Sequence, residues 1–373
     1  MSTTRATLIR LAGGRVPVLA VALMATAQAS ATQFELTEGS EVFGEDLHIK
    51  THYSDTLSEI ARRYSLGWEE LIRANPKVDP WLPGEGTDLV IPGRRILPPG
   101  PHEGIVVNLP EHRLYYFPKP AKGQKPVVVT YPVSIGKMDW TTPLGQTYIT
   151  EKIKNPQWNP PASVRAEHLA NGDPLPPGPV KSGPDNPLGL FAMRLAVKPG
   201  DYLIHGTNNP LAVGMPITHG CIRMYPEDVE AIFPTVPRRT PVYLINAPLK
   251  VAFEDGHLLL EAHPPVDAEG QSVEPVLSQF ETKLNEVLGD TTTAINWDIA
   301  EEALSKANGI PVLVGLQADL DPPPAQPATD GPTKDQAPTV SAPAPGPVPA
   351  TPAAAGASGV TMATAKTVLE SKS

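Results

Sequence analysis

Two kinds of hydrophobic spacing occur along the chain, and the first is helical. In residues 54–93, a capping box at Thr56 and Glu59 starts a helix whose apolar positions share one face. A second short helix, in "GWEELIRANP", ends at Asn75 and Pro76. The stretch "LHIKTHY" before the helices and "DLVIP" after them are typical of strands. This order of strand, helix, helix and strand predicts a small α+β unit over residues 47–93.

From about residue 103 the spacing changes to the alternation of apolar and polar residues that predicts strands. The alternation runs through "GIVVNLPEHRLYYFP", "KPVVVTYPVSIG", "GQTYITEKI", "DYLIHGT" and "TPVYLIN". These segments predict a mainly β domain over residues 103–248. A stretch rich in Pro and Gly, residues 156–189, interrupts them and is too long for a hairpin turn. We expect this stretch to form a lid or a binding loop.

The last third of the chain has a third pattern. A hairpin is predicted with its turn at Asp255 and Gly256, and helical spacing follows at residues 277–288 and 297–308. We therefore expect a hairpin with a helical appendix over residues 249–318. Residues 321–352 hold eleven prolines with Ala, Thr and Gly between them. This composition predicts a disordered tail over residues 319–373.

The start of the chain indicates export. Arg5, Arg10 and Arg15 precede the apolar run "VPVLAVALMA", and small residues follow in "TAQASAT". This pattern predicts a secretory signal peptide over residues 1–31, with a mature chain in the periplasm that contacts the membrane only during export. The alternative, an uncleaved anchor, is disfavoured because the apolar run is too short to span a bilayer.

Charge and cysteine content narrow the function. A net charge of −10 argues against a nucleic-acid partner. The chain has a single cysteine, Cys221, which can form no internal disulfide although the protein is expected in an oxidising compartment. Cys221 is therefore a small buried hydrophobe, a metal ligand or a nucleophile. With His205 and His219 it offers three zinc ligands, but their spacing fits no usual zinc signature, so we expect no metal and no cofactor.

The stretch "YLIHGTNNPLAVGMPITHGCIRM" favours the nucleophile. His205 ends an apolar strand, and His219 and Cys221 follow 14 and 16 residues later. A thiol attacks only as the thiolate, which a histidine within hydrogen-bond reach generates at neutral pH. The backbone N–H groups of Gly220 and Cys221 are candidate donors for an oxyanion.

Residues 54–93 resemble the LysM module. The segments "SDTLSEIARRY", "LIRANP" and "LVIPG" match that family's pattern in its order, although Ser54 replaces the usual glycine. The resemblance implies binding of glycans that contain N-acetylglucosamine, such as peptidoglycan strands.

The segment from about 103 to 248 resembles the L,D-transpeptidase catalytic family (YkuD/ErfK), and its periplasmic branch in particular. The motif is "HGT" followed by "THGCIRM", and "NPLGLFAMRL" and "NPQWNPP" add to the similarity. The resemblance implies a YkuD-like β-sandwich.

It also implies roles for the residues of the motif. Cys221 would be the nucleophile and His205 its base, with the Gly206 carbonyl holding the imidazole tautomer. His219 and Gly220 would belong to the acyl-binding wall and the oxyanion region. Three further residues are expected to contact the substrate: Arg223, which suits a carboxylate, Thr218, which stands where serine is commoner, and Tyr202.

The reaction that the resemblance implies is acyl transfer on peptidoglycan stem peptides. Cys221 would attack a tetrapeptide stem and expel its terminal D-alanine, and a second stem would then give a 3–3 cross-link. A lysine of a wall-anchored lipoprotein is another possible acceptor. Two alternatives stay open: a cysteine amidase or carboxypeptidase, and a non-catalytic wall-binding protein. Glycan binding and catalysis are expected in separable units, so that removing residues 33–97 spares the chemistry on soluble stems.

Overall fold

The computed structural model describes residues 32–136, 142–198, 202–265, 277–288 and 293–317. The predicted signal peptide and the predicted disordered tail lie outside these residues. No helix within the described ranges is long and apolar enough to cross a membrane.

The helical spacing near the start forms the predicted α+β unit. Its elements are β3 (Leu47–Lys50), α1 (Leu57–Arg63), α2 (Trp68–Ala74) and β4 (Asp88–Ile91). Both hydrogen bonds of the capping box are present, because the Thr56 side chain accepts from the Glu59 N–H and the Glu59 carboxylate accepts from the Thr56 N–H. Strands β3 and β4 pair antiparallel, and the apolar faces of both helices are buried in the core of this unit.

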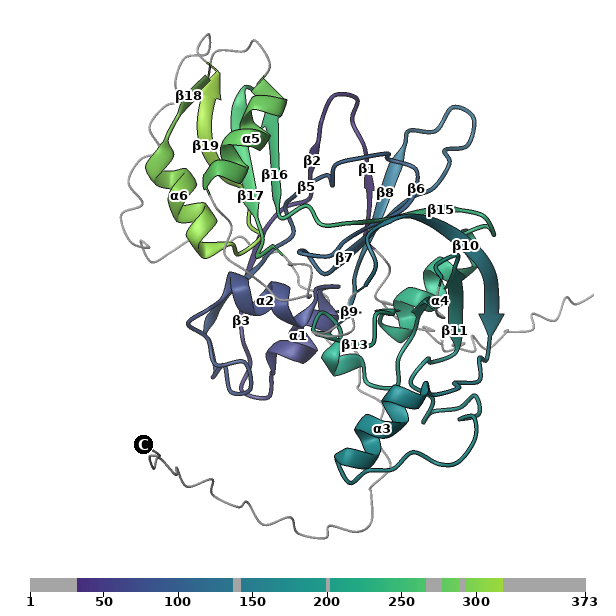
Figure 1. Ribbon diagram of the computed structural model, residues 1–373. Coiled ribbons are helices and arrows are strands. Elements are labelled where there is room, and N and C mark those ends of the chain that lie inside the picture. The colour runs from purple at the N-terminus through teal and green to yellow at the C-terminus, as the bar shows by residue number, and fades with distance from the viewer. Residues whose placement is uncertain (1–31, 137–141, 199–201, 266–276, 289–292, 318–373) are drawn as a thin grey trace, which may run out of the picture. The chain divides into compact units, whose positions relative to one another are not determined.

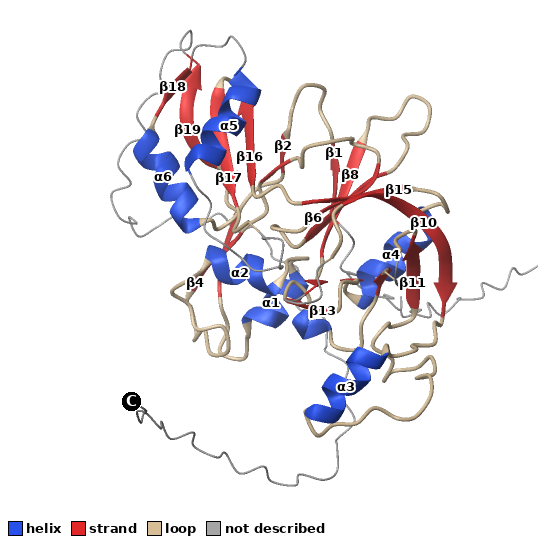
Figure 2. Cartoon of the chain, in the orientation of Figure 1, coloured by secondary structure: helices blue, strands red, loops and turns tan. Residues whose placement is uncertain are grey.

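The alternating segments form one sheet of nine strands (Figures 1 and 2). In spatial order these are β1 (Thr32–Glu35), β8 (Val127–Pro132), β7 (Arg113–Phe117), β6 (Gly104–Asn108), β15 (Pro241–Ile245), β10 (Gly145–Lys154), β11 (Phe191–Leu195), β12 (Leu203–His205) and β14 (Ile222–Arg223).

Strand β10 divides this sheet into two halves. Its first residues, 145–148, pair with β15, and its last residues, 149–154, pair with β11, with a register shift between Ile149 and Glu151. Side chains from both halves, including Ile105 and Ile204, share one buried core with α4 (Pro226–Thr235). The catalytic segment is therefore the mainly β, sandwich-like domain that the sequence predicts.

Residues 249–317 form an α/β unit. The hairpin of β16 (Leu249–Glu254) and β17 (His257–Ala262) turns at Asp255 (φ 49°) and Gly256 (φ 76°), as predicted. The predicted helices are α5 (Leu277–Leu288) and α6 (Trp297–Lys306). Two strands that the sequence pattern did not predict, β18 (Thr293–Ile295) and β19 (Val312–Gln317), complete a sheet in the order β16-β17-β19-β18. Both helices pack on one face of this sheet (Figure 2).

The chain enters the β domain before it forms the LysM-like unit. Strand β1 pairs with β8 at the edge of the nine-stranded sheet. Strand β2 (Val42–Phe43), which precedes the LysM-like unit in sequence, pairs with β5 (Arg95–Ile96), which follows it. Removing residues 33–97 therefore deletes most of an edge strand of the catalytic sheet. The deletion would thus change the catalytic sheet as well as the LysM-like unit, and its expected lack of effect on soluble stems stays a prediction.

Candidate active site

The residues of the sequence motif meet in one cleft of about 1070 Å³. Five of them line it: His205, Thr218, His219, Cys221 and Arg223. Strands β12 and β14 are parallel neighbours, and His205 lies opposite Arg223 in their register. This pairing brings residues from distant parts of the chain to the same end of the sheet.

The structure keeps the His205 imidazole neutral. Its side chain is 4% exposed, and Nδ1 donates a hydrogen bond of 2.6 Å to the Gly206 carbonyl oxygen. Burial, reinforced by the charge of Arg223, lowers the pKa of His205 to about 3 against the opposing effect of that hydrogen bond. The ring is therefore uncharged at neutral pH. Because Nδ1 carries the proton, Nε2 is the nitrogen able to accept one.

Cys221 lies in a turn that its neighbours hold from two sides. The Thr218 hydroxyl donates to the Cys221 carbonyl oxygen at 2.5 Å, and the Thr142 hydroxyl donates to the Gly220 carbonyl oxygen at 3.1 Å. Gly220 has φ +89°, a conformation that favours glycine. The half-buried Cys221 packs against a small cluster of Leu188, Ala192 and Leu203, and Trp158 packs against the same cluster.

Arg223 brings positive charge next to the thiol. Burial lowers the pKa of Arg223 while Cys221 opposes that shift, yet a guanidinium remains charged at physiological pH. Its Nε is buried and makes no hydrogen bond within the described part of the chain. A cation beside a cysteine favours the thiolate.

Three of the expected substrate and wall residues have other contacts. The Thr218 hydroxyl is used on the Cys221 carbonyl, so its contribution here is to the turn. His219 Nε2 contacts the Glu167 carboxylate at 2.7 Å. Tyr202 is not among the described residues that line the cleft, and its ring packs against the domain core instead. The expected contact of Tyr202 with substrate therefore stays a prediction.

Most of the other residues that line the cleft were not predicted from the sequence. The 156–189 stretch contains α3 (Ala162–Ala170), which carries Glu167, and it lines one side of the cleft with Trp158. Arg194 and Lys198 line it from β11 and the segment after it. Trp158 lies in "NPQWNPP", so that motif was a usable signal. Glu167 is a single glutamate on a short polar helix, and the sequence around it gives no signal of a functional role.

A possible metal-binding group lies away from this cleft. Among the described residues, Glu111, Glu261 and His263 place ligand atoms within 4.8 Å of one another. The Lys250 ammonium lies 2.7 Å from a carboxylate oxygen of both glutamates. The Lys250 ammonium thus occupies the position that a metal ion would need.

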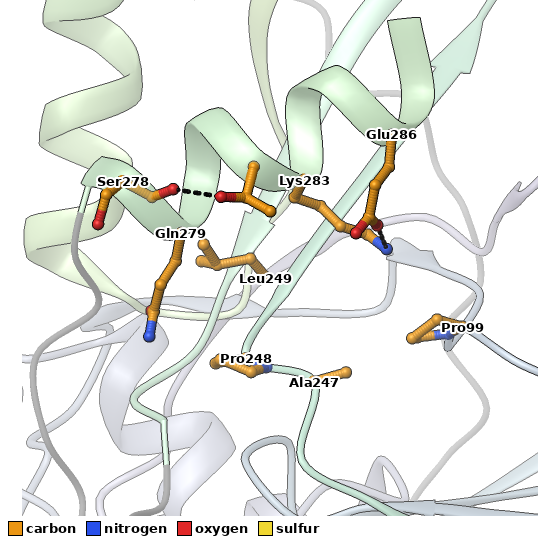
Figure 3. Close-up of a pocket in the computed structure, with 9 residues that line it drawn as sticks. Pro99, Ala247, Pro248, Leu249, Ser278, Gln279, Lys283 and Glu286 are labelled. Carbon is orange, nitrogen blue, oxygen red and sulfur yellow. Dashed lines mark hydrogen bonds and ion pairs between the residues drawn. The ribbon is translucent and has the colours of Figure 1, made fainter. Parts of the chain in front are cut away.

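A second cavity, of about 430 Å³, lies between α5 and the segment around Pro248 (Figure 3). Its polar side chains interact within α5: Thr282 donates to the Ser278 carbonyl oxygen, and Lys283 pairs with Glu286 at 2.8 Å. None of the described residues that line it is a histidine or a cysteine. The described lining of the cavity therefore lacks the histidine and cysteine pair that lines the cleft.

Asp228, in the first turn of α4, is expected to destabilise the fold at neutral pH. It is 3% exposed, and its Oδ2 has no hydrogen-bond partner among the described residues. Burial, with help from Glu227, raises its pKa to about 7 despite Arg113 and Arg62. The unfolded value is near 3.8, so ionisation of Asp228 costs the folded state stability as pH rises from about 4 to 7.

Asp228→Asn is therefore expected to raise the melting temperature at pH 8, by the equivalent of roughly 2–4 kcal/mol at about 1.4 kcal/mol per pKa unit. The gain should shrink toward pH 4, where the wild-type carboxyl is protonated in both states. Melting curves of both proteins from pH 4 to pH 8 measure this. A gain that is constant across the range would contradict the titration of Asp228.

Comparisons with known proteins identify the family of this chain. The L,D-transpeptidase catalytic domain family (YkuD) matches residues 102–244, and the LysM domain family matches residues 53–92. The probable L,D-transpeptidase YcfS of Escherichia coli K12 is 42% identical over 232 residues, which cover 61% of this chain and 71% of that protein. The probable L,D-transpeptidase YbiS of the same strain is 37% identical over 294 residues, which cover 76% and 92%.

Among solved structures, L,D-transpeptidase 3 from Mycobacterium tuberculosis is 18% identical, with 54% of this chain and 92% of that chain covered and a TM-score of 0.27. That score is too low to support an argument. The family match and the curated relatives decide the assignment. The chain belongs to the L,D-transpeptidases of the YkuD family and carries a LysM domain.

Proposed function

We propose that Cys221 forms a covalent acyl-enzyme with the tetrapeptide stem of peptidoglycan. One observation carries the proposal: a neutral His205, with its tautomer set by the Gly206 carbonyl, lines the same cleft as Cys221. A neutral imidazole accepts the thiol proton as sulfur attacks, which is the requirement for a cysteine nucleophile.

The reaction has two balanced steps. In the first, Sγ of Cys221 bonds to the carbonyl carbon of the third stem residue while its proton passes to His205 Nε2. The C–N bond to the terminal D-alanine breaks, and the proton on His205 leaves with that amine. In the second, an incoming amine bonds to the thioester carbonyl carbon and gives a proton to His205. The C–S bond breaks, and His205 passes that proton to the sulfur, which restores the thiol. The N–H groups of Gly220 and Cys221 are the candidate donors to the oxyanion in both steps.

The positive charge of the cleft supports a negatively charged acyl-donor substrate. Arg194, Lys198 and Arg223 line it, and none of the described lining residues is Asp or Glu, although the whole chain has a net charge of −10. Stem peptides carry free carboxylates, which a guanidinium binds well. Arg223 is the best candidate for a direct contact because its buried Nε is otherwise without a hydrogen-bond partner in the described residues.

The LysM domain supplies a candidate surface for the glycan strand. Tyr53 and Trp81 are 84% and 61% exposed, and they belong to two loops joined by a hydrogen bond from the Leu57 N–H to the Pro80 carbonyl oxygen. Exposed aromatic rings of this kind stack on apolar sugar faces and place a polar edge in water. We propose that the exported enzyme acts on the wall in the periplasm, with a second stem or a lysine of a wall lipoprotein as acceptor.

Muropeptide profiling tests the choice of acceptor. Overexpression of the wild-type protein, compared with Cys221→Ala at equal abundance, is expected to increase 3–3 cross-linked dimers or stems attached to a lysine peptide. An increase of tripeptide stems alone would mean that water is the acceptor and that the enzyme is a carboxypeptidase. A loss of existing 3–3 or stem-to-lysine links would favour the amidase alternative.

A further inference from the structure

The segment between the catalytic histidine and cysteine contacts the LysM domain. This segment contains η1 (Pro210–Ala212) and leads into β13 (Pro216–Thr218). The Trp68 N–H, at the start of α2, donates to the Val213 carbonyl oxygen at 3.0 Å. The Ser58 hydroxyl of α1 donates to the Leu211 carbonyl oxygen at 3.2 Å. A backbone N–H at the N-terminus of α2, which has no partner within its own helix, thus finds its acceptor in the segment between His205 and Cys221.

The two backbones approach so closely that both positions require glycine. A Cβ on Gly67 would lie 2.9 Å from the Gly214 Cα, and a Cβ on Gly214 would lie 2.3 Å from the Trp68 nitrogen. Met215, the next residue, packs against the LysM core. The contact is therefore a packed seam, which we define as Ser58, Gly67 and Trp68 against residues 211–215.

The opposite side of the loop is held by the catalytic domain. His112 Nδ1 donates to the Gly214 carbonyl oxygen at 2.6 Å, and the Ser134 hydroxyl donates to the Ala212 carbonyl oxygen at 3.0 Å. The backbone of Ser134 in turn exchanges two hydrogen bonds with Arg223, of 2.8 and 3.0 Å. The loop is clamped between the LysM domain and a residue paired directly with the catalytic motif.

The LysM domain also contacts the chain just after Cys221. The Tyr225 hydroxyl donates to the Leu66 carbonyl oxygen at 3.0 Å. Arg62 forms two hydrogen bonds with the Glu227 carboxylate, of 2.7 and 2.9 Å. The segments before and after Cys221 therefore both contact the LysM domain, through residues 211–215 and 225–227.

We propose that the LysM domain is a positioning element of the active site, and that Gly67 and Trp68 set the place of Cys221 through the seam. The inference rests on the proposed function only for the assignment of Cys221 as the nucleophile. Positional errors of about 1 Å in a reacting group cost up to about a hundredfold in rate. A LysM domain that moves the loop therefore changes catalysis on a soluble substrate that it never binds.

Gly67→Ala tests the seam with little other disturbance. Gly67 has φ −85°, which alanine adopts without strain, so the new methyl group clashes chiefly with Gly214. We expect kcat on a soluble tetrapeptide stem to fall about tenfold or more, with KM within about twofold. The rate of Cys221 alkylation by iodoacetamide, followed from pH 5 to pH 9, should also shift in its pH profile.

Thr56→Ala is the matched control. Thr56 and Gly67 are both N-cap residues of LysM helices, but Thr56 lies outside the seam. Losing the Thr56 cap costs about 1 kcal/mol, so this control destabilises a LysM helix without adding a methyl group to the seam. A wild-type kcat and alkylation profile in folded Gly67→Ala, or an equal loss of kcat in Thr56→Ala, would overturn the inference.

If Gly67→Ala does not fold, Ser58→Ala/Arg62→Met replaces it. This double variant removes one anchor from each flank of the motif and adds no steric conflict. We expect kcat to fall about threefold with KM unchanged, and an unchanged kcat would contradict the proposal. Failure of the proposed function has a different signature: wild-type protein without acyl transfer, in which alkylation of Cys221 still responds to Gly67→Ala.

Discussion

Cys221→Ala is expected to abolish acyl transfer, with release of D-alanine from a tetrapeptide stem falling by at least about a thousandfold. The covalent step needs a nucleophilic sulfur, and no second cysteine exists in the chain to replace it. Intact-mass spectrometry after incubation with a carbapenem gives an independent measurement. We expect one adduct on the wild-type protein and none on Cys221→Ala, while the melting temperature stays near that of the wild type.

His205→Ala separates the base from the nucleophile in the same experiment. The thiol remains, so the adduct should still form, but more slowly near pH 7, because general-base assistance is worth about a hundred- to ten-thousandfold. An unchanged rate would transfer the role of base to His219. An adduct that survives in Cys221→Ala would contradict the assignment of the nucleophile.

Donor length adds a control that requires no mutation. The proposed attack leaves one residue beyond the scissile bond, so a tetrapeptide stem should react and a pentapeptide stem should not. Ampicillin resembles the D-Ala-D-Ala end of a pentapeptide and should give little adduct under conditions in which the carbapenem reacts. Efficient release of D-alanine from the pentapeptide would contradict the proposed specificity for tetrapeptide stems.

Local patterns were sufficient to predict most elements of the fold. The capping box at Thr56 located the start of α1, and Asp255 with Gly256 located a hairpin turn because both residues tolerate positive φ. The alternation in residues 103–248 predicted the strands, since one buried face imposes a period of two. Cys221, His205 and Arg223 could be predicted as site residues because they lie close together in sequence and their residue types indicate a nucleophile, a base and a carboxylate-binding group.

What the sequence could not show depends on contacts between distant residues. Glu167 reaches His219 from a polar helix 52 residues away, and nothing in "ASVRAEHLA" marks that residue. Tyr202 adjoins the motif, and the sequence does not show that it packs, partly buried, against the core of the catalytic domain. The seam at Gly67 and Gly214 joins residues 147 positions apart, and two glycines that meet across it look like ordinary turn residues in sequence.

A buried network of charges was equally invisible, because its members lie in three separate segments. Lys250 of β16 is 1% exposed and contacts Glu111 before β7 and Glu261 of β17, each at 2.7 Å. Lys250 also donates to the Ile96 carbonyl oxygen, and His263 contacts the Glu261 carboxylate at 2.7 Å. The network ties the α/β unit of residues 249–317 to the catalytic domain. In sequence these residues resemble ordinary surface charges.

Lys250→Met is therefore expected to lower the free energy of unfolding by about 3–5 kcal/mol, because it leaves two buried carboxylates without the cation between them. Urea unfolding at pH 7 measures the loss. Lys283→Met is the matched control, since Lys283 pairs with Glu286 on the surface of α5 and such pairs contribute about 0–1 kcal/mol. A loss in Lys250→Met no larger than that of the control would mean that the network contributes no stability.

The pH dependence distinguishes a lost charge from lost packing. Burial alone would raise the pKa of Glu261, but Lys250, His263 and the Ile96 N–H lower it to about 2. In the wild type, this carboxylate stabilises the fold above its unfolded pKa of about 4.5, and the contribution is lost as pH falls toward 2. Without the ammonium the folded pKa should rise above 4.5, so that Lys250→Met loses stability as pH increases. The difference in melting temperature between the two proteins should then widen from pH 4 to pH 7. A difference that stays constant over this range would indicate that the lysine contributes through its methylene chain and not through its charge.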